Sequence, residues 1–385
     1  MKRHKYHVFM FYLLKALASP VVKAITGYSC VKEKGPPGPA IIIANHNTDL
    51  DPVLVALGFS RHIYFLASEH AFRKNLLVRL IFRLCAVISI NKTHSDSTAV
   101  KEMLRRLKAG YNVCLFAEGN RSYTGVTGYI SPATAKLVKA SGAQLITFRL
   151  EGGYLTTPRW AKGRRKGKMA GCVAGRYSAA DLRAMTNEDV LSVIKRDIYE
   201  NAYERQKDTP IPYRGKDLAE HIETVLYLCP SCQSIGTIHS RGDDFFCGCG
   251  LKATYTETGF LEGRGLPFST IAAWNSWQVK RLADIVRDAG EEPICGDEAQ
   301  RLFKVQPTRS GDFMGEGELR MTAREFSCAG FVFPLEQITR LTIVDQMTLV
   351  FSLKDGTHYE IRSVSPRNAL KYTEIMRILK EIHNA

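Results

Sequence analysis

The sequence predicts an α/β fold with a mainly parallel sheet, followed by a cysteine-rich module and a smaller β-rich region that ends in a helix. Three observations support this prediction. Apolar strand-like runs alternate with helical patterns between residues 38 and 160, four cysteines form two close pairs within residues 229–249, and short alternating segments follow from residue 301. At 385 residues, of which 45% are hydrophobic, the chain is long enough for two or three domains.

The α/β region is defined by five apolar runs and by the helical segments between them. The predicted strands are residues 40–44, 63–67, 87–90, 113–116 and 145–150, and the predicted helices include residues 97–109 and 132–140. Residues 188–207 also have helical periodicity, and the proline-containing segment 208–215 interrupts it. We therefore expect this domain, an α/β sandwich, to span residues 31–207.

Polar side chains follow the first predicted strand directly. The strand leads into Asn45 and His46, and Asp51 lies five positions beyond the histidine at the start of an expected helix. Imidazole is the side chain best suited to accept a proton near neutral pH, and a carboxylate within reach can fix its tautomer. His46 is therefore our candidate general base, with Asp51 as its partner. Simple capping of the helix by this polar turn is the alternative interpretation.

A second polar turn follows the strand at residues 113–116. It contains Glu118, Gly119 and Arg121. Glycine lets the backbone approach a ligand closely, and a guanidinium offers forked donors that match phosphate. The turn therefore predicts an anion site, with a surface Glu–Arg pair as the alternative. Because ligand sites in α/β sheets gather at the carboxyl ends of the strands, we expect both turns to share one pocket.

Together the two turns resemble the conserved blocks of the glycerolipid acyltransferases, the PlsC-type 1-acyl-glycerol-3-phosphate acyltransferase family. The first block is Asn45-His46 through Asp51, and the second is residues 116–122, Phe-Ala-Glu-Gly-Asn-Arg-Ser. Residues 86–92 and 144–150 resemble two further blocks, so that the resemblance covers residues 1–205. Three positions depart from the family pattern, which has proline, threonine and arginine there: Ala117, Asn120 and Lys92.

The resemblance implies a reaction and roles for these residues. His46 would take the proton of a glycerol hydroxyl while Asp51 holds its ring, and the oxygen would attack an acyl thioester directly, without a catalytic metal. The donor would be acyl coenzyme A or acyl carrier protein. The acceptor would be lysophosphatidate, giving phosphatidate; glycerol-3-phosphate or another lysolipid is the alternative. The residues expected around the acceptor and its phosphate are Asn45, Lys92, Glu118, Gly119 and Arg121.

Four of the ten cysteines form a metal-ligand pattern. Cys229 and Cys232 are separated by two residues, Cys247 and Cys249 by one, and fourteen residues lie between the two pairs. Two such knuckles joined by a hairpin suit four thiolates around one structural zinc ion, so residues 221–257 are predicted to be a zinc ribbon. A disulfide pair is the alternative. His239 is a candidate substitute ligand, and residues 241–244 have the composition of the connecting turn.

The charge of the chain points to an anionic partner. The formal net charge is +15, and basic residues are frequent at the N-terminus and in residues 159–168, beside Trp160. With the lipid chemistry above, we expect this second cluster to contact anionic head groups while Trp160 anchors at the interface. A zinc-ribbon factor that binds nucleic acid or protein without catalysis is the alternative class; for the acyltransferase, membrane lipids and no nucleic acid are the expected partners.

The N-terminal segment is apolar but interrupted. Residues 7–26 approach a membrane-spanning length, yet they contain Lys15 and Pro20, so residues 1–30 are expected to form an interfacial helix or a shallow hairpin. Residues 76–84 form an apolar helix that places Arg79 and Arg83 on one side. We expect a monotopic or peripheral protein on the cytoplasmic face of the cell membrane.

The C-terminal part is predicted to be β-rich. Residues 266–290 are expected to form a connecting helix that carries Trp274 and Trp277. Residues 301–385 resemble a pleckstrin-homology-like domain, a small sheet or barrel closed by a helix at residues 367–383. Its predicted strands are residues 317–321, 325–328, 338–344, 348–353 and 357–362.

Overall fold

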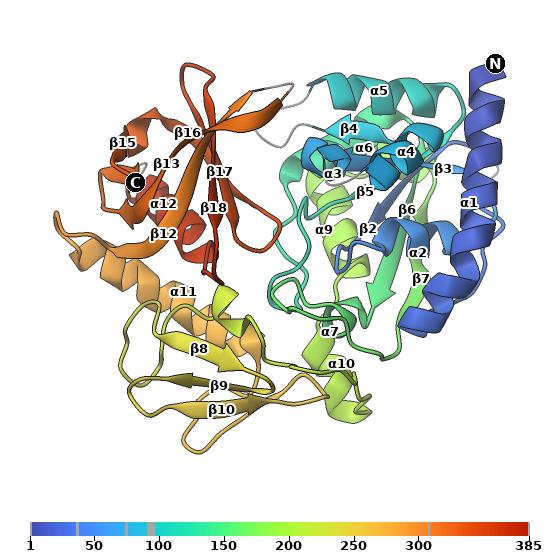
Figure 1. Cartoon of the computed structure of the whole chain (residues 1–385). Coiled ribbons are helices and arrows are strands. Elements are labelled where there is room, and N and C mark those ends of the chain that lie inside the picture. The colour runs from blue at the N-terminus through green and yellow to red at the C-terminus, as the bar shows by residue number, and fades with distance from the viewer. Residues whose placement is uncertain (1, 36–37, 74–75, 91–96, 307–308, 384–385) are drawn as a thin grey trace. The chain divides into compact units, whose positions relative to one another are not determined.

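A computed structural model of the chain describes residues 2–35, 38–73, 76–90, 97–306 and 309–383 (Figure 1). It divides into two compact units. The first comprises residues 1–159 and 164–215, and the second comprises residues 160–163 and 216–385.

The first unit is built on a seven-stranded sheet. Its strands follow the order β1 (Ser29–Cys30), β7 (Ala170–Tyr177), β6 (Gln144–Glu151), β2 (Ala40–Ala44), β5 (Asn112–Phe116), β3 (Ile63–Ser68) and β4 (Ile88–Ile90). All neighbours are parallel except β6 and β7. The predicted mainly parallel sheet is therefore confirmed, and β1 and β7 extend it on the side where the sequence predicted no strand.

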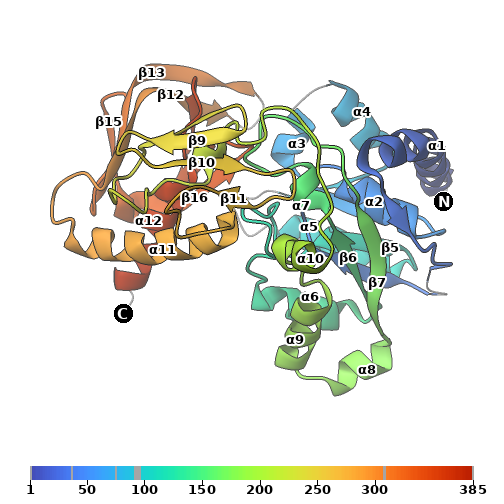
Figure 2. The same cartoon turned by 90° about the horizontal axis from the view of Figure 1, so that it is seen from below.

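Helices cover both faces of this sheet (Figures 1 and 2). Strand β2 is fully buried, and its side chains alternate between two cores because successive residues of a strand point to opposite faces. Ile42 packs with residues of α1 (Lys2–Thr26) and α2 (Asp51–Gly58). Ile41 and Ile43 pack with residues of α5 (Ser97–Lys108), α6 (Pro132–Ser141) and α9 (Asn187–Asp197). The smaller helices of this unit are α3 (Glu69–Arg73), α4 (Leu76–Leu84), α7 (Gly153–Thr156), α8 (Ala179–Ala184) and α10 (Ala202–Asp208).

The N-terminal segment forms one helix, α1, which continues through Pro20 instead of folding into a hairpin. Phe11 and Val22 are buried in the core of the first unit, and the Lys15 ammonium donates to the backbone carbonyl of Phe59. Among the described residues, the segment His4–Thr26 is the one helix long and apolar enough to cross a membrane, and little of it is buried.

The prediction of one continuous helix at residues 188–207 is wrong, because the helix is interrupted between α9 and α10. At the break, the Glu200 amide donates to the Thr127 hydroxyl (2.8 Å), and the Thr127 amide donates to the Glu200 carbonyl (2.9 Å). Asn201 then caps α10 by accepting from the amides of Tyr203 and Glu204. Pairing with a distant loop thus overrides a local pattern that is helical throughout.

The second unit begins with a small antiparallel sheet in the order β11 (Leu261–Glu262), β10 (Lys252–Tyr255), β9 (Asp244–Cys247) and β8 (Ile238–Arg241). The turn between β8 and β9 falls at the predicted residues, with Gly242 at φ +67°. Helix α11 (Ile271–Asp288) follows the sheet and is hydrogen-bonded to the segment that precedes Cys229. Trp274 Nε1 donates to the Leu228 carbonyl (2.9 Å), and Gln278 Nε2 donates to the Val225 carbonyl (2.8 Å).

A second antiparallel sheet completes this unit. Its order is β15 (Phe331–Pro334), β14 (Glu325–Cys328), β13 (Arg309–Met321), β12 (Cys295–Gln306), β18 (His358–Ser363), β17 (Thr348–Leu353) and β16 (Ile338–Val344). Short 3-10 turns lie at Ile222–Thr224 and Leu335–Gln337, and α12 (Leu370–His383) ends the described chain. The predicted order of strands followed by one helix is confirmed, whereas the likeness to pleckstrin-homology domains stays a prediction.

The predicted lipid contact of Trp160 is wrong. Its side chain is 1% exposed and packs edge-on against Tyr255, with ring centroids 5.2 Å apart. Arg159 and Arg165 of the same basic cluster are buried as well. A ring enclosed by protein cannot anchor at a lipid surface. Trp160, Arg159 and Arg165 therefore belong to the protein interior.

Candidate active site

His46 and Asp51 form a hydrogen-bonded pair at the carboxyl end of β2. His46 Nδ1 lies 2.9 Å from Asp51 Oδ2, and the Asp51 carboxylate is fully buried. A carboxylate partner assigns the proton to Nδ1, so Nε2 is the ring atom that can accept a proton from a substrate. The histidine side chain is 21% exposed, and its ring stacks on that of Phe116 with the ring centroids 4.5 Å apart. The pair thus has the geometry of an oriented general base.

The loop between β2 and α2 folds around the Asp51 carboxylate. Asp51 Oδ2 accepts from the amides of Asn47 (2.6 Å) and Thr48 (2.9 Å), and Oδ1 accepts from the Thr48 hydroxyl (2.7 Å). The N-cap residue of α2 is Leu50, which makes no side-chain capping bond. The polar loop therefore serves to fix the carboxylate and, through it, the imidazole.

Asn45 ties the end of β2 to β6. Its Nδ2 donates to the Leu150 carbonyl (2.8 Å), and its Oδ1 accepts from the Leu150 amide (2.7 Å). The side chain is fully buried. Both polar atoms of Asn45 are bonded to the neighbouring strand, which holds the strand end that presents His46. The predicted contact of Asn45 with substrate stays a prediction.

The second predicted turn clamps His46 through its backbone. Glu118 Oε1 accepts from the His46 amide (2.7 Å), and Oε2 accepts from the Gly128 amide (2.6 Å). The Ser122 amide donates to the His46 carbonyl (2.8 Å). Gly119, at φ +69°, allows the turn that brings these groups together. The two turns therefore meet, as predicted, with the histidine held between them.

Glu118 holds the backbone of His46 in this structure, and its predicted contact with the acceptor phosphate stays a prediction. Both carboxylate oxygens are engaged by amides, and a carboxylate beside a phosphate would be repelled. Burial raises the pKa of Glu118 from 4.5 to about 7, against the lowering effect of the bonds from Gly128 and His46.

Arg121 is the cation of the site. Its Nε donates to the Asn47 carbonyl (3.2 Å), and its Nη2 donates to the Thr157 carbonyl (3.0 Å). Its Nη1 lies 3.1 Å from Asp49 Oδ2, and the Asp49 side chain is 71% exposed. The guanidinium is thus fixed on the loop that carries His46, and its remaining nitrogen, Nη1, already lies beside the Asp49 carboxylate.

The predicted site residue Lys92 lies outside the described residues. The site also contains supporting residues that the sequence did not predict. Thr48, Phe116, Ser122 and Gly128 support the histidine but were not among the predicted site residues. Three of the four lie at least 70 positions from His46 in sequence, and only the meeting of the two loops reveals their contacts.

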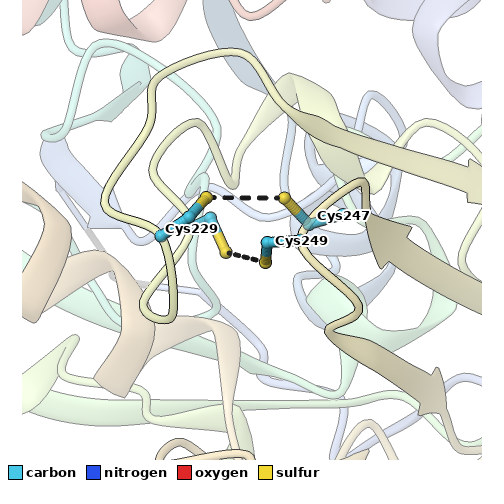
Figure 3. A group of neighbouring side chains, drawn as sticks. Cys229, Cys247 and Cys249 are labelled. Atoms are coloured by element: carbon cyan, nitrogen blue, oxygen red, sulfur yellow. Dashed lines mark hydrogen bonds between the residues drawn. The ribbon is translucent and has the colours of Figure 1, made fainter.

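The four predicted cysteines converge in the second unit. Cys229, Cys247 and Cys249 point toward one another in Figure 3, and the four Sγ atoms, including that of Cys232, lie within 4.8 Å of each other. The Sγ atoms of Cys229 and Cys249 are 3.7 Å apart, and so are those of Cys232 and Cys247. Tetrahedral bonds of roughly 2.3 Å from sulfur to zinc give sulfur–sulfur distances of roughly 3.8 Å, so the cluster fits such an ion. His239 is outside the cluster and packs near Phe246.

Comparison with known proteins finds a match within the first unit. Residues 29–151 match the family model described as Acyltransferase, and this segment contains both active-site loops. This match supports the predicted resemblance to an acyltransferase family over this segment of the chain. No curated protein sequence matched the chain.

Solved structures include two similar chains. The 1-acyl-sn-glycerophosphate (LPA) acyltransferase PlsC from Thermotoga maritima is 20% identical, with a TM-score of 0.42 over 50% of this chain and 80% of its own. The C-terminal domain of an unknown protein from Leishmania infantum is 14% identical, with a TM-score of 0.17 over 25% of this chain and 93% of its own.

Proposed function

We propose that this protein transfers a fatty acyl group from an acyl thioester to the free hydroxyl of lysophosphatidate and thereby forms phosphatidate. The observation that carries the proposal is the His46–Asp51 pair, 2.9 Å apart, within a matched acyltransferase domain. Arg121 supports the phosphate-bearing acceptor, because its guanidinium is bonded to Asn47 in the loop of the same histidine.

The reaction follows from the orientation of the imidazole. His46 Nε2 takes the proton of the acceptor hydroxyl as the oxygen attacks the thioester carbonyl carbon. The carbon–sulfur bond then breaks, and the leaving thiolate takes the proton back from the imidazolium, so the products are an ester and a free thiol. Asp51 stabilises the charged ring meanwhile, and such general-base assistance contributes about 10²- to 10⁴-fold to rate.

The acceptor phosphate would replace Asp49 on Arg121. The Asp49 carboxylate of this pair is exposed, so the pair contributes modest free energy, whereas a phosphate carries more charge and can accept two parallel hydrogen bonds. A phosphate held there lies beside the loop that carries His46, which suits an acceptor with its hydroxyl a few bonds from its phosphate. The phosphate monoester of lysophosphatidate carries more negative charge than the phosphodiester of a lysolipid with a further head group, and this charge favours lysophosphatidate on Arg121.

We further propose that the protein lies on the cytoplasmic face of the membrane without crossing it. Contacts with the first unit occur along most of α1, from His4 with Tyr64 and His7 with Leu84 to Val22 in the core. A helix covered along one side by a folded domain cannot at the same time be surrounded by lipid. Large apolar side chains on the outer surfaces of α1 and α4 are exposed: Phe9, Leu13, Leu17, Val21, Leu76, Leu77 and Leu80. They suit insertion into one leaflet.

The four cysteines are proposed to hold one structural zinc ion, with no position open for catalysis. A disulfide needs sulfurs about 2.05 Å apart, whereas the Cys229–Cys249 and Cys232–Cys247 Sγ atoms are 3.7 Å apart and all four cysteines are free. Four sulfur ligands complete a tetrahedral shell, which is typical of structural sites.

A substrate panel tests the proposed activity. The purified protein in detergent is incubated with lysophosphatidate, other lysolipids or glycerol-3-phosphate, each with acyl coenzyme A or acyl carrier protein, and products are identified by mass spectrometry. We expect phosphatidate from lysophosphatidate and none from the His46→Ala variant. Absence of acyl transfer from every pair would overturn the proposal, and salt-sensitive retention on DNA by the same inactive protein would favour the nucleic-acid alternative.

A further inference from the structure

A pocket lies at the amino-terminal ends of the strands of the first unit's sheet, opposite to the candidate active site. It has a volume of about 740 Å³ and is lined by residues from α1, α4 and α5. Tyr64 and Tyr111 in its wall stand at the beginning of β3 and just before β5. His46 and Glu118, in contrast, follow the ends of β2 and β5. The pocket is therefore separate from the candidate active site.

The lining of this pocket is strongly cationic. It includes Arg83, Arg105 and Arg106 but one acidic residue, Glu102. Glu102 pairs with Arg105 (2.8 Å) and with Arg106 (2.7 Å). Arg83 has no acidic partner within the described part of the chain. Three guanidinium groups against one carboxylate leave a net positive charge facing the pocket.

The wall of the pocket is held in place before any ligand arrives. The His4 ring stacks on Tyr111 at 3.9 Å, and its Nδ1 lies 2.7 Å from the Tyr64 hydroxyl. The Arg106 guanidinium lies 3.9 Å above the Tyr64 ring, and its Nη1 donates to the Ala86 carbonyl (2.9 Å). This arrangement fixes one guanidinium and fastens the first turns of α1 to the domain. A preformed cationic wall reduces the ordering cost of binding an anion.

Apolar side chains lie beside the pocket on α4. Leu76 and Leu80 precede the lining residue Arg83 by seven and three positions, so the three residues share one face of this helix. Leu76 is 73% exposed and Leu80 is 52% exposed. A charged recess next to exposed apolar surface fits a molecule with an anionic head and hydrocarbon chains better than it fits a free anion.

We propose that this pocket binds the phosphate-bearing head group of an anionic membrane phospholipid, with the lipid chains lying along the exposed apolar surface of α4. It would hold the domain on anionic membranes independently of catalysis. A failure of the acyl-transfer assay would therefore leave this proposal standing, and the reverse also holds.

A vesicle-binding experiment on the full chain tests the proposal. Wild type, Arg83→Ala with Arg105→Ala, and the control Lys136→Ala with Arg183→Ala are compared; both pairs remove two exposed cations from the first unit. Binding is measured on phosphatidylcholine vesicles with and without phosphatidylglycerol. We expect the pocket variant to lose about 30-fold in affinity for the anionic vesicles, at roughly fivefold for each cation, and the control to change little. Thermal unfolding and acyl transfer in detergent should stay at wild-type values in both variants.

A second arm separates a lipid site from a free-phosphate site. Short-chain phosphatidylglycerol, below the concentration at which it forms micelles, is titrated against inorganic phosphate at matched ionic strength. Saturable binding of the short-chain lipid that the pocket variant loses and the control retains supports the proposal. Equal affinity for inorganic phosphate, or equal losses of vesicle binding in the two variants, would overturn it.

Discussion

The candidate active site and the cysteine cluster are held together in different ways. His46 is kept in place by hydrogen bonds from two loops, through Asp51, Glu118 and Ser122. The cluster brings the sulfurs of four cysteines together within 4.8 Å. The first arrangement orients one side chain on an already packed sheet, whereas the second supplies cross-links to a small sheet. Changes at the first should therefore reduce activity, and changes at the second should reduce stability.

The largest expected effect is the loss of the metal. Replacing Cys232 and Cys247 by serine should remove the ion and destabilise the ribbon, since metal binding of this kind contributes about 10 kcal/mol in isolated zinc modules. Elemental analysis should show about one zinc per wild-type chain and none in the variant. Thermal unfolding should show an earlier transition for the second unit, with turnover per folded molecule little changed.

The matched control for this experiment is Cys85→Ser, which removes a half-buried thiol outside the cluster. It should keep the metal and the wild-type unfolding transition. A wild-type protein that contains neither zinc nor iron, or a double variant that unfolds like wild type, would contradict a structural metal.

The next largest effect is expected from Glu118→Gln. One amide nitrogen of the new side chain would face a backbone N–H, so one bond of the clamp on His46 is lost. We expect kcat to fall by up to about 10²-fold, the scale of a small misplacement of a catalytic group, with a smaller change in KM. Steady-state kinetics of the purified variant measure this, and Glu188→Gln, an exposed site on α9, is the control.

The same variant has a signature in the pH dependence of stability. Because burial raises the pKa of Glu118 in the folded state to about 7 from 4.5, the folded protein binds more protons than the unfolded chain between these values. The free energy of unfolding therefore decreases as pH rises from about 4.5 to about 7. The Gln variant should show a flatter dependence over this window. An unchanged slope together with unchanged kcat would show that Glu118 does not position the histidine.

The smallest effect is expected from Asp49→Asn. Removing the carboxylate that lies 3.1 Å from Arg121 should free the guanidinium for the acceptor phosphate. The KM for lysophosphatidate should fall up to about fivefold, the scale of an exposed ion pair, while kcat stays near its wild-type value. A rise in KM would contradict this account, because it would mean that Asp49 holds Arg121 in its binding position.

The fold was predictable where strands are apolar and short loops join them. Strands β2, β14, β16 and β17 have the predicted residues, because their patterns are strongly apolar or alternating. Strands β7 and β12 were missed because AGCVAGRY is rich in glycine and alanine and CGDEAQRLFKVQ is mostly polar. Both are stabilised by pairing with strands that are distant in sequence or joined by a long hairpin, which local composition does not reveal.

The residues of the active site were predictable by type but not always by role. His46 and Asp51 lie in one loop, so their pairing follows from short spacing. Glu118 and Asn45 were expected at substrate, yet their partners are backbone amides and carbonyls 72 and 105 residues away. Contacts of this kind depend on how strands are ordered in the sheet, and no local pattern carries that information. The catalytic and substrate-binding assignments themselves stay predictions.

One measurement tests the central claim most directly: the turnover of His46→Ala with lysophosphatidate and an acyl thioester, beside a thermal unfolding curve of the same preparation. An imidazole that takes the proton of the acceptor hydroxyl predicts a loss of about 10²- to 10⁴-fold in kcat, with an unfolding transition close to that of wild type. Wild-type turnover in the folded variant would show that another group activates the hydroxyl.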